Sequence, residues 1–271
     1  MRWVTANPGR GRRILLGALP LAVLALGYII AAAARHADNP ADKILPLPGA
    51  MAAAMAGLLF QADPLSGQYL FWADTLASLW RLGLGLGIAT ASTLLVGVVV
   101  GSLPPVRATL GPLVTAIAVV PPIALLPILF IVFGLGETAK VALIVVGVAP
   151  FMIRDVAGHI AALPREQVVK ALTLAANSWG AILRVTLPQA LPRLIEGLRL
   201  SLGPAWVFLI SAEAIAADVG LGYRIFLVRR YLAMDVILPY VAWIAVLAVV
   251  MDFALSQVSR RLFGWAHLGA R

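Results

Sequence analysis

Residues 82–103 read LGLGLGIATASTLLVGVVVGSL, a run that contains no charged side chain. A helix needs about 20 mostly apolar residues to cross the hydrocarbon core of a bilayer. The length of this run and its lack of charge therefore predict a helix that spans a membrane. We accordingly expect the chain to fold as an integral membrane protein.

Five further apolar stretches are long enough to span a bilayer. They lie at 14–34, about 111–133, about 139–158, about 194–215 and about 236–257. The first exceeds the roughly 7–15 apolar residues of a signal peptide, so we expect it to be retained. The sequence thus predicts an all-α fold of six transmembrane helices. A basic N-terminus (1–13) precedes the single transmembrane domain (14–257), and a tail (258–271) follows it.

The composition excludes several classes of protein. Hydrophobic residues make up 62% of the chain and charged residues 12%, whereas about 25% is usual for charged residues in soluble domains. A soluble enzyme is therefore excluded. The chain has no cysteine, and His36, His159 and His267 lack metal-ligand spacing, so no metal site is predicted. We attribute the net charge of +9 to membrane orientation and contact with anionic lipid, and we expect no nucleic-acid partner.

Positive charges are divided unequally between the two sides of the predicted membrane domain. Fourteen Lys and Arg residues fall on the side of both termini and seven on the other. The positive-inside rule then places both termini in the cytoplasm. Residues 159–193 form a long cytoplasmic loop in this arrangement. Residues 35–75 lie outside, where Pro46 and Pro48 precede a short apolar helix expected along the interface.

Small residues recur at regular intervals in the second span. Gly83, Gly87 and Ala91, and then Gly97 and Gly101, recur at intervals of four, which favours close packing inside the chain or, as an alternative, a subunit interface.

The third span contains prolines that interrupt helical hydrogen bonding. Pro121, Pro122 and Pro127 predict either a simple kink or a broken helix that lines a passage. The second alternative makes Pro121 and Pro122 candidate residues of a translocation pathway.

The cytoplasmic loop contains LPREQVVKALTLAANSWG at 163–180, which has the pattern of a short amphipathic helix. Val168, Leu172, Ala175 and Trp179 would form one apolar stripe, and Glu166 would pair with Lys170 four residues later. Such a helix either docks into a groove of a soluble partner or rests on the membrane surface.

This loop resembles the cytoplasmic loop of permease subunits in binding-protein-dependent ABC importers. Counted back from Leu187-Pro188, the motif Glu falls on Val169, its two Ala on Lys170 and Ala171, and its Gly on Ala175. Of these positions only Ala171 and the Leu-Pro ending keep the family residue. The resemblance implies an ATPase-coupling helix, comprising Arg165, Glu166, Val168, Val169, Lys170, Ala171, Leu172, Ala175 and Trp179.

Further segments extend the resemblance over about 44–265 and towards permeases for sulfonates, taurine, nitrate, cyanate or bicarbonate. They are ILPLP (44–48), SLWRLGLGLGIA (78–89), VPPIALLPILFIVFGLGETAK (120–140), SAEAIAADVGLGY (211–223) and RRLFGW (260–265). The resemblance implies the type I importer fold, a bacterial inner-membrane location and a partner permease copy in a homodimer. It also implies two cytoplasmic ATPase subunits that bind ATP and Mg, and a periplasmic or lipid-anchored binding protein. The chain itself has no GxxxxGK[ST] phosphate loop and needs no cofactor.

Acidic residues in or near the spans are candidates for function. Glu213 adjoins a long apolar run and is a candidate for the pathway or its outer gate, with Trp206 on the same face; a cap or packing role is the alternative. Asp252 is expected to pair with an arginine. Arg224, Arg229 and Arg230 would attract an anion, a binding protein or lipid on the outer side.

We therefore expect a translocation subunit without enzymatic activity of its own. It would import a small polar solute: a sulfonate, taurine, nitrate, cyanate, bicarbonate or a small nitrogen-rich compound. The alternative is a self-contained secondary transporter or channel, which would need coupling-ion groups deep in several spans. A membrane enzyme would need a nucleophile or a cluster of His, Asp and Glu, and the sequence suggests neither.

Overall fold

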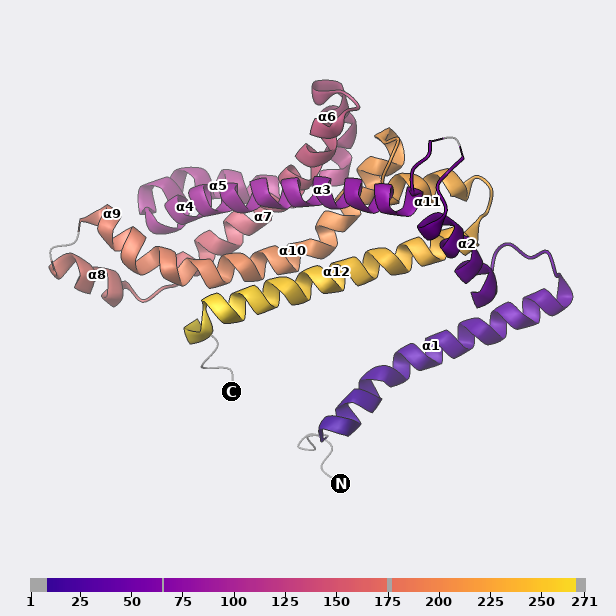
Figure 1. Ribbon diagram of the computed structural model, residues 1–271. Coiled ribbons are helices and arrows are strands. Elements are labelled where there is room, and N and C mark those ends of the chain that lie inside the picture. The colour runs from indigo at the N-terminus through magenta and orange to yellow at the C-terminus, as the bar shows by residue number, and fades with distance from the viewer. Residues whose placement is uncertain (1–8, 65, 175–176, 267–271) are drawn as a thin grey trace.

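The computed structural model describes residues 9–64, 66–174 and 177–266, and within them every regular element is helical (Figure 1). Five helices are long and apolar enough to cross a membrane, and a sharply bent pair makes up to six. The five unbroken spans are Gly11–Asp38, Leu70–Ser102, Glu137–Ala161, Ser178–Ala216 and Met234–Leu262. They contain five of the six predicted spans to within a residue, and the bent pair accounts for the sixth.

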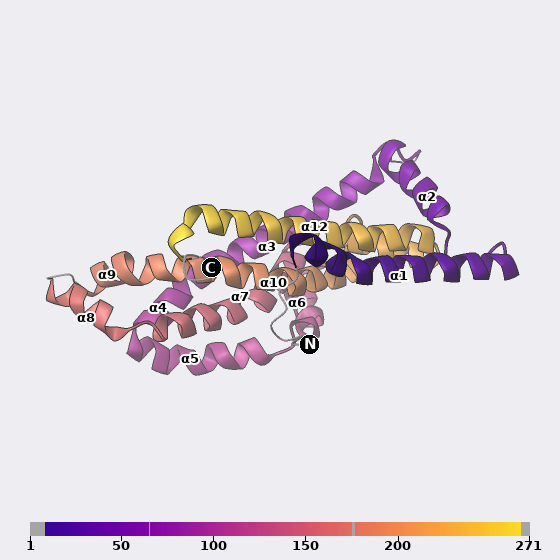
Figure 2. The same ribbon diagram turned by 90° about the horizontal axis from the view of Figure 1, so that it is seen from below.

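Helix α7 (Glu137–Ala161) forms the centre of the bundle. It packs against α3 (Leu70–Ser92), α4 (Val98–Ser102), α5 (Pro104–Val119) and α10 (Leu187–Ala216). Its buried side chains include Leu143, Ile144, Val148, Met152 and Val156, all within the apolar core. A π-helical turn, η2 (Thr93–Gly97), joins α3 to α4 without breaking the span. Figures 1 and 2 show α12 (Met234–Leu262) alongside α10.

The glycines of the second span divide into a packed set and an open set. A Cβ on Gly85 would lie 2.7 Å from Ile144, and one on Gly101 would lie 2.8 Å from Ile160, so α7 approaches this span closely at both points. Gly83 and Gly87 have open space around them, and Ala91 is exposed. The prediction of internal packing is therefore right for Gly97 and Gly101, which both face α7, and wrong for the Gly83–Gly87–Ala91 row, which lies on the outer face of α3.

The third predicted span is broken. Helix α5 ends at Val119, and η3 (Pro122–Leu125) and α6 (Leu126–Phe133) leave it at an angle of 88°. Steric contact with a following proline disfavours helical backbone, and Val120 and Pro121, which both precede a proline, are extended with ψ of 127° and 114°. Of the two alternatives drawn from the sequence, the broken helix is the one observed.

The cytoplasmic loop contains two short helices where one was predicted. Helix α8 covers Arg165–Thr173 and α9 covers Ser178–Ala181, followed by the π-helical turn η4 (Ile182–Thr186) and then α10. The Asn177 side chain accepts a hydrogen bond from the Gly180 amide at 2.6 Å and caps α9. Ala175 lies outside the described residues. The predicted stripe from Val168 to Trp179 is therefore wrong as one helical face, because a new helix begins between its two ends.

The N-terminal elements lie to one side of this bundle. Helix α1 (Arg10–Asp38) stands apart from α12 in Figure 1, and its apolar side chains are exposed along most of its length. The short apolar helix α2 (Pro48–Phe60) follows and packs against α3 and α12. The Tyr28 hydroxyl donates to the Pro46 carbonyl at 2.7 Å and fixes the link between α1 and α2. Helix α11 (Leu221–Arg229) forms the corner between α10 and α12.

Candidate functional site

The α8–α9 segment carries exposed apolar side chains at one end of the bundle. Leu172 is 45% exposed and Trp179 is 59% exposed, and Val169 and Leu174 are also exposed. Figure 1 shows this segment at the far end from the α10–α11 corner, joined to the bundle through α7 and α10. An apolar group of this size on a short helix is a typical docking surface for another protein.

A cavity of about 640 Å³ lies between α8 and the neighbouring end of the bundle. Val168, Val169 and Leu172 line it from α8, Leu103 and Pro104 from the α4–α5 turn, and Ile182 from η4. The Gln189 side-chain amide donates to the Gln167 carbonyl at 2.8 Å and links α8 to α10. Helix α8 is thus held at its edge and not packed solidly against the spans. No ion pair joins Glu166 to Lys170 in the part of the chain that the structure describes, so that predicted contact is not formed.

The predicted residue Glu213 is fully buried at the opposite end of the bundle. It accepts hydrogen bonds from the Ser78 hydroxyl at 2.8 and 2.9 Å, from the Gly222 amide at 2.8 Å and from Arg81 Nη1 at 2.7 Å. A buried carboxylate is tolerated only when it is paired and hydrogen-bonded, and here both oxygens are satisfied. The side chain therefore ties α10 to α3 and to the start of α11.

Arg81 connects this buried site to the surface. It is 3% exposed and donates to the Val219 carbonyl at 2.7 Å and to Glu137, whose carboxylate also accepts from Lys140 at 2.8 Å. Glu137 begins α7, where a carboxylate also favours the positive end of the helix dipole. The guanidinium thus joins α3, α7 and α10 through charged hydrogen bonds.

A second buried carboxylate holds the same corner. Asp74 accepts from Arg224 Nε at 2.7 Å, from the Gly220 amide at 2.9 Å and from the Tyr240 hydroxyl at 3.1 Å. Gly220 has φ of +140°, and a Cβ there would lie 2.6 Å from Glu213, so only glycine fits this turn. Arg224 is one of the three outer arginines expected to attract an anion, a binding protein or lipid, and in the structure Asp74 neutralises it.

The remaining predicted pathway residues lie in two places. Trp206 is buried in the core on α10, and its indole nitrogen has no hydrogen-bond partner among the described residues. Pro121 is exposed and Pro122 half-buried at the break between α5 and α6, where η3 packs against α10. Trp206 and Glu213 therefore share one helix, and the two prolines approach that helix from the broken span.

The sequence interpretation missed Asp74, Arg81, Lys140 and Tyr240 as parts of the two buried networks at this corner. Their partners are separated by as many as 166 residues, and such pairings leave no local pattern. The available signal was a charge within an apolar helix, since Asp74 and Arg81 both lie in α3. The expectation for Asp252 is confirmed, because Arg199 donates to its two oxygens at 2.9 and 3.0 Å.

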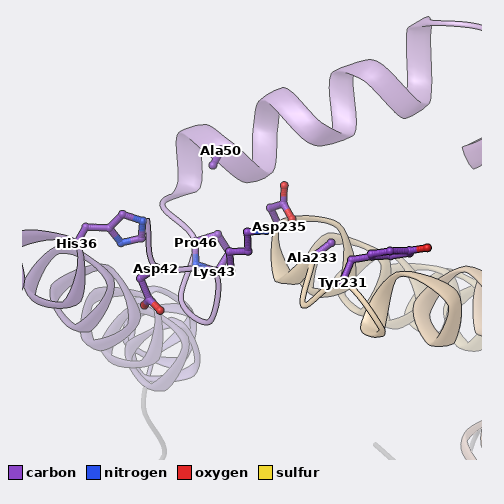
Figure 3. Close-up of a pocket in the computed structure, with 8 residues that line it drawn as sticks. All are labelled: His36, Asp42, Lys43, Pro46, Ala50, Tyr231, Ala233 and Asp235. Atoms are coloured by element: carbon purple, nitrogen blue, oxygen red, sulfur yellow. The ribbon is translucent and has the colours of Figure 1, made fainter. Parts of the chain in front are cut away.

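A small polar crevice lies between the α1–α2 link and the start of α12 (Figure 3). It has a volume of about 310 Å³, and Figure 3 shows Lys43 extending towards Asp235 while Asp42 turns away. Arg35 donates to Asp42 at 2.7 Å and lowers the pKa of that carboxyl to about 2. This ion pair closes the turn after α1, so the acidic side chain of Asp42 at the crevice has a structural role. Within residues 9–64, 66–174 and 177–266 no group of His, Asp and Glu has the arrangement of a metal site.

Comparisons with known proteins agree with this architecture. The family model described as "Binding-protein-dependent transport system inner membrane component" matches residues 83–264. The taurine transport system permease protein TauC of Escherichia coli is 37% identical over 72% of this chain and 70% of its own length. The putative aliphatic sulfonates transport permease protein SsuC of Bacillus subtilis is 27% identical over 97% of this chain and 92% of its own.

A solved structure shows the same fold. A chain of the MetNI methionine ABC transporter in an inward-facing conformation matches with a TM-score of 0.63 at 21% identity. The match covers 73% of this chain and 99% of that one.

Proposed function

The chain belongs to the family of inner membrane components of binding-protein-dependent transport systems, and from that premise we propose how it transports its substrate. It is the membrane-spanning permease subunit of an ABC importer. Our proposal is that two copies form a homodimeric pathway, that two cytoplasmic ATPase subunits bind ATP and Mg, and that a periplasmic or lipid-anchored binding protein delivers the solute. Membrane lipid surrounds the pair.

The α8–α9 segment is proposed as the mechanical joint to the ATPase. The observation that carries this proposal is the exposure of Leu172 and Trp179 on two short helices inserted between α7 and α10. Val168, Val169, Ala171 and Leu172 supply apolar contact, while Glu166 and Lys170 supply charged groups; the side chain of Arg165 lies outside those that the structure describes. Closure of the ATPases would press this segment and rotate α7 and α10 as rigid bodies, as alternating access requires.

The broken span is proposed to border the pathway. Pro121 and Pro122 lack amide protons and interrupt the helix between α5 and α6, and such a break survives in a membrane only beside protein or a water-filled passage. The neighbouring helix α10, with Trp206 and Glu213, would form the wall behind the break and its outer gate. The ion pairs described above support import without a coupling ion, because the carboxylates of Asp74 and Glu213 are already neutralised by arginine.

We propose a sulfonate, with taurine first, as the transported solute, because relatives at 37% and 27% identity are named for taurine and aliphatic sulfonates. The other expected solutes, nitrate, cyanate, bicarbonate and small nitrogen-rich compounds, serve as competitors in the test. The permease is reconstituted in vesicles with its ATPase and binding protein, and labelled taurine is added. We expect uptake that requires both ATP and the binding protein. Uptake driven by an ion gradient without ATP would instead indicate a secondary transporter.

Both termini are proposed to be cytoplasmic, with residues 39–69 outside. Reporter fusions after Gln61 and after Arg271 test this arrangement. A reporter that is active only in the periplasm should work at the first position and be silent at the second. Activity at the second position would contradict the proposed orientation and place α8 on the wrong side for an ATPase.

A further inference from the structure

Two arginines line a small cavity between α5 and α7. The cavity has a volume of about 240 Å³, and Arg107 from α5 and Arg154 from α7 contribute its only charges. Its other walls are small or apolar, with Gly111, Thr115, Ala157, Gly158 and Ala161 among them. In the part of the chain that the structure describes, neither arginine pairs with a carboxylate.

Arg107 is held in place by the backbone. Its Nε donates to the Val100 carbonyl at 3.3 Å, and its Nη2 donates to the Gly101 carbonyl, so it caps the end of α4. Its remaining nitrogen, Nη1, has no partner among the described residues, and neither does the Arg154 guanidinium. The nearest acid in sequence, Asp155, is bonded to Arg193 on α10 and not to Arg154, whose side chain is exposed.

The same end of the bundle contains another unpaired donor. Arg107 also lines the 640 Å³ cavity beneath α8, together with Ser102, whose hydroxyl is buried and has no partner in the described residues. Buried polar atoms in folded proteins are nearly always hydrogen-bonded, but the Ser102 hydroxyl lacks an acceptor among the described residues of this neighbouring cavity, which Arg107 also borders.

The geometry points to an oxyanion site between α5 and α7 in which Arg107 and Arg154 bind a phosphate or sulfonate group. Guanidinium groups bind such oxyanions through paired, charge-assisted hydrogen bonds. A volume of 240 Å³ is below the roughly 300–1,000 Å³ of sites for drug-sized ligands, so it fits an anionic head and not a large solute. The group is borne either by an anionic lipid or by a free sulfonate. Basic pockets between transmembrane helices are known to bind lipid head groups. Only the second source rests on the proposed function.

The test measures anion binding to the full-length permease and does not depend on transport. Dioleoyl phosphatidylglycerol is titrated into delipidated protein in an uncharged detergent and bound lipid is counted by native mass spectrometry. Methanesulfonate is titrated separately by calorimetry. We expect Arg154→Gln and Arg107→Gln each to weaken binding at least tenfold, because a charged hydrogen bond is lost. Arg107→Lys should retain part of the affinity and controls for loss of the α4 cap.

Arg184→Gln is the matched control. Arg184 is exposed in η4, at the same end of the bundle, has no carboxylate partner in the described chain and does not line the cavity. Selective loss of lipid binding identifies a lipid site, and selective loss of methanesulfonate binding identifies a solute site. Equal affinity in wild type, Arg154→Gln and Arg107→Gln, or an equal loss in Arg184→Gln, would overturn the proposal. Failure of ATP-dependent uptake in the wild type would bear on the proposed function alone.

Discussion

Arg81→Met is expected to destabilise the folded permease by about 3–5 kcal/mol, the range typical of removing one partner of a buried ion pair. The substitution leaves Glu213 as a carboxylate of 0% exposure without its cation, and it also frees Glu137 and the Val219 carbonyl. Little correctly folded protein should remain at growth temperature. The yield of monodisperse protein and its thermal unfolding midpoint in detergent measure the effect.

Two further variants show whether burial is the cause. Arg199→Met removes an arginine from an ion pair that is partly exposed on both sides, and such pairs are worth about 1 kcal/mol or less. Arg81→Met combined with Glu213→Gln removes both buried charges and should recover part of the stability. If Arg81→Met and Arg199→Met lower the thermal unfolding midpoint equally, the buried ion pair of Arg81 stabilises the protein no more than the partly exposed pair of Arg199.

Leu172→Asp is expected to release the ATPase or to uncouple ATP hydrolysis from uptake. Leu172 is exposed on α8 beside the cavity, and truncating one dominant contact residue costs typically about 2 kcal/mol or more, or about thirtyfold in affinity. A buried charge in the joint would cost at least as much. The permease should still insert, because Leu172 lies outside the spans. ATPase retained on purification and uptake into vesicles are the two measurements.

Thr173→Ala serves as the control for this experiment. Thr173 is the next residue of α8, and its exposed hydroxyl donates only to the Lys170 carbonyl of its own helix, so the change should leave both measurements near wild type. Wild-type ATPase retention and uptake in Leu172→Asp would show that α8 is not the coupling element.

Much of the fold follows from the length of the apolar runs. A span is recognised by a consecutive stretch of apolar residues long enough to cross a bilayer. Such a stretch can be read from the sequence without knowing which residues it will contact. The boundaries were less accurate where amphipathic turns extend a span. The fifth helix was expected from about 194 but begins at Ser178, because η4 and Pro188 at the first turn of α10 continue the helix towards α9. The proline is tolerated there because it follows the π-helical turn η4, where the hydrogen bonding already departs from the regular α-helical pattern.

The site was predictable only in part. A helical repeat of apolar residues correctly indicated α8. The repeat continues in the sequence through Trp179, but the helix ends at Thr173 and Asn177 caps a new one. Glu213 was found because an acid beside an apolar run is rare. Its partners Ser78 and Arg81 lie 135 and 132 residues earlier, and nothing local in α3 states which later residue will neutralise it.

The corner that joins α3 to α10 and α11 also constrains the order in which the protein is made. The first span of the bundle leaves the ribosome with Asp74 and Arg81 already in it, whereas Glu213 and Arg224 are synthesised 132 and 150 residues afterwards. An uncompensated charge in a lipid-facing helix costs about 2.5–3.5 kcal/mol at the bilayer centre and less towards the helix end, where Asp74 lies near the start of α3. Glu137 relieves Arg81 when α7 arrives, but Asp74 waits for Arg224. Until Arg224 is synthesised, α3 is more stable beside the insertion machinery or at the membrane edge than in contact with lipid. Biogenesis of this subunit is therefore completed from its C-terminal half.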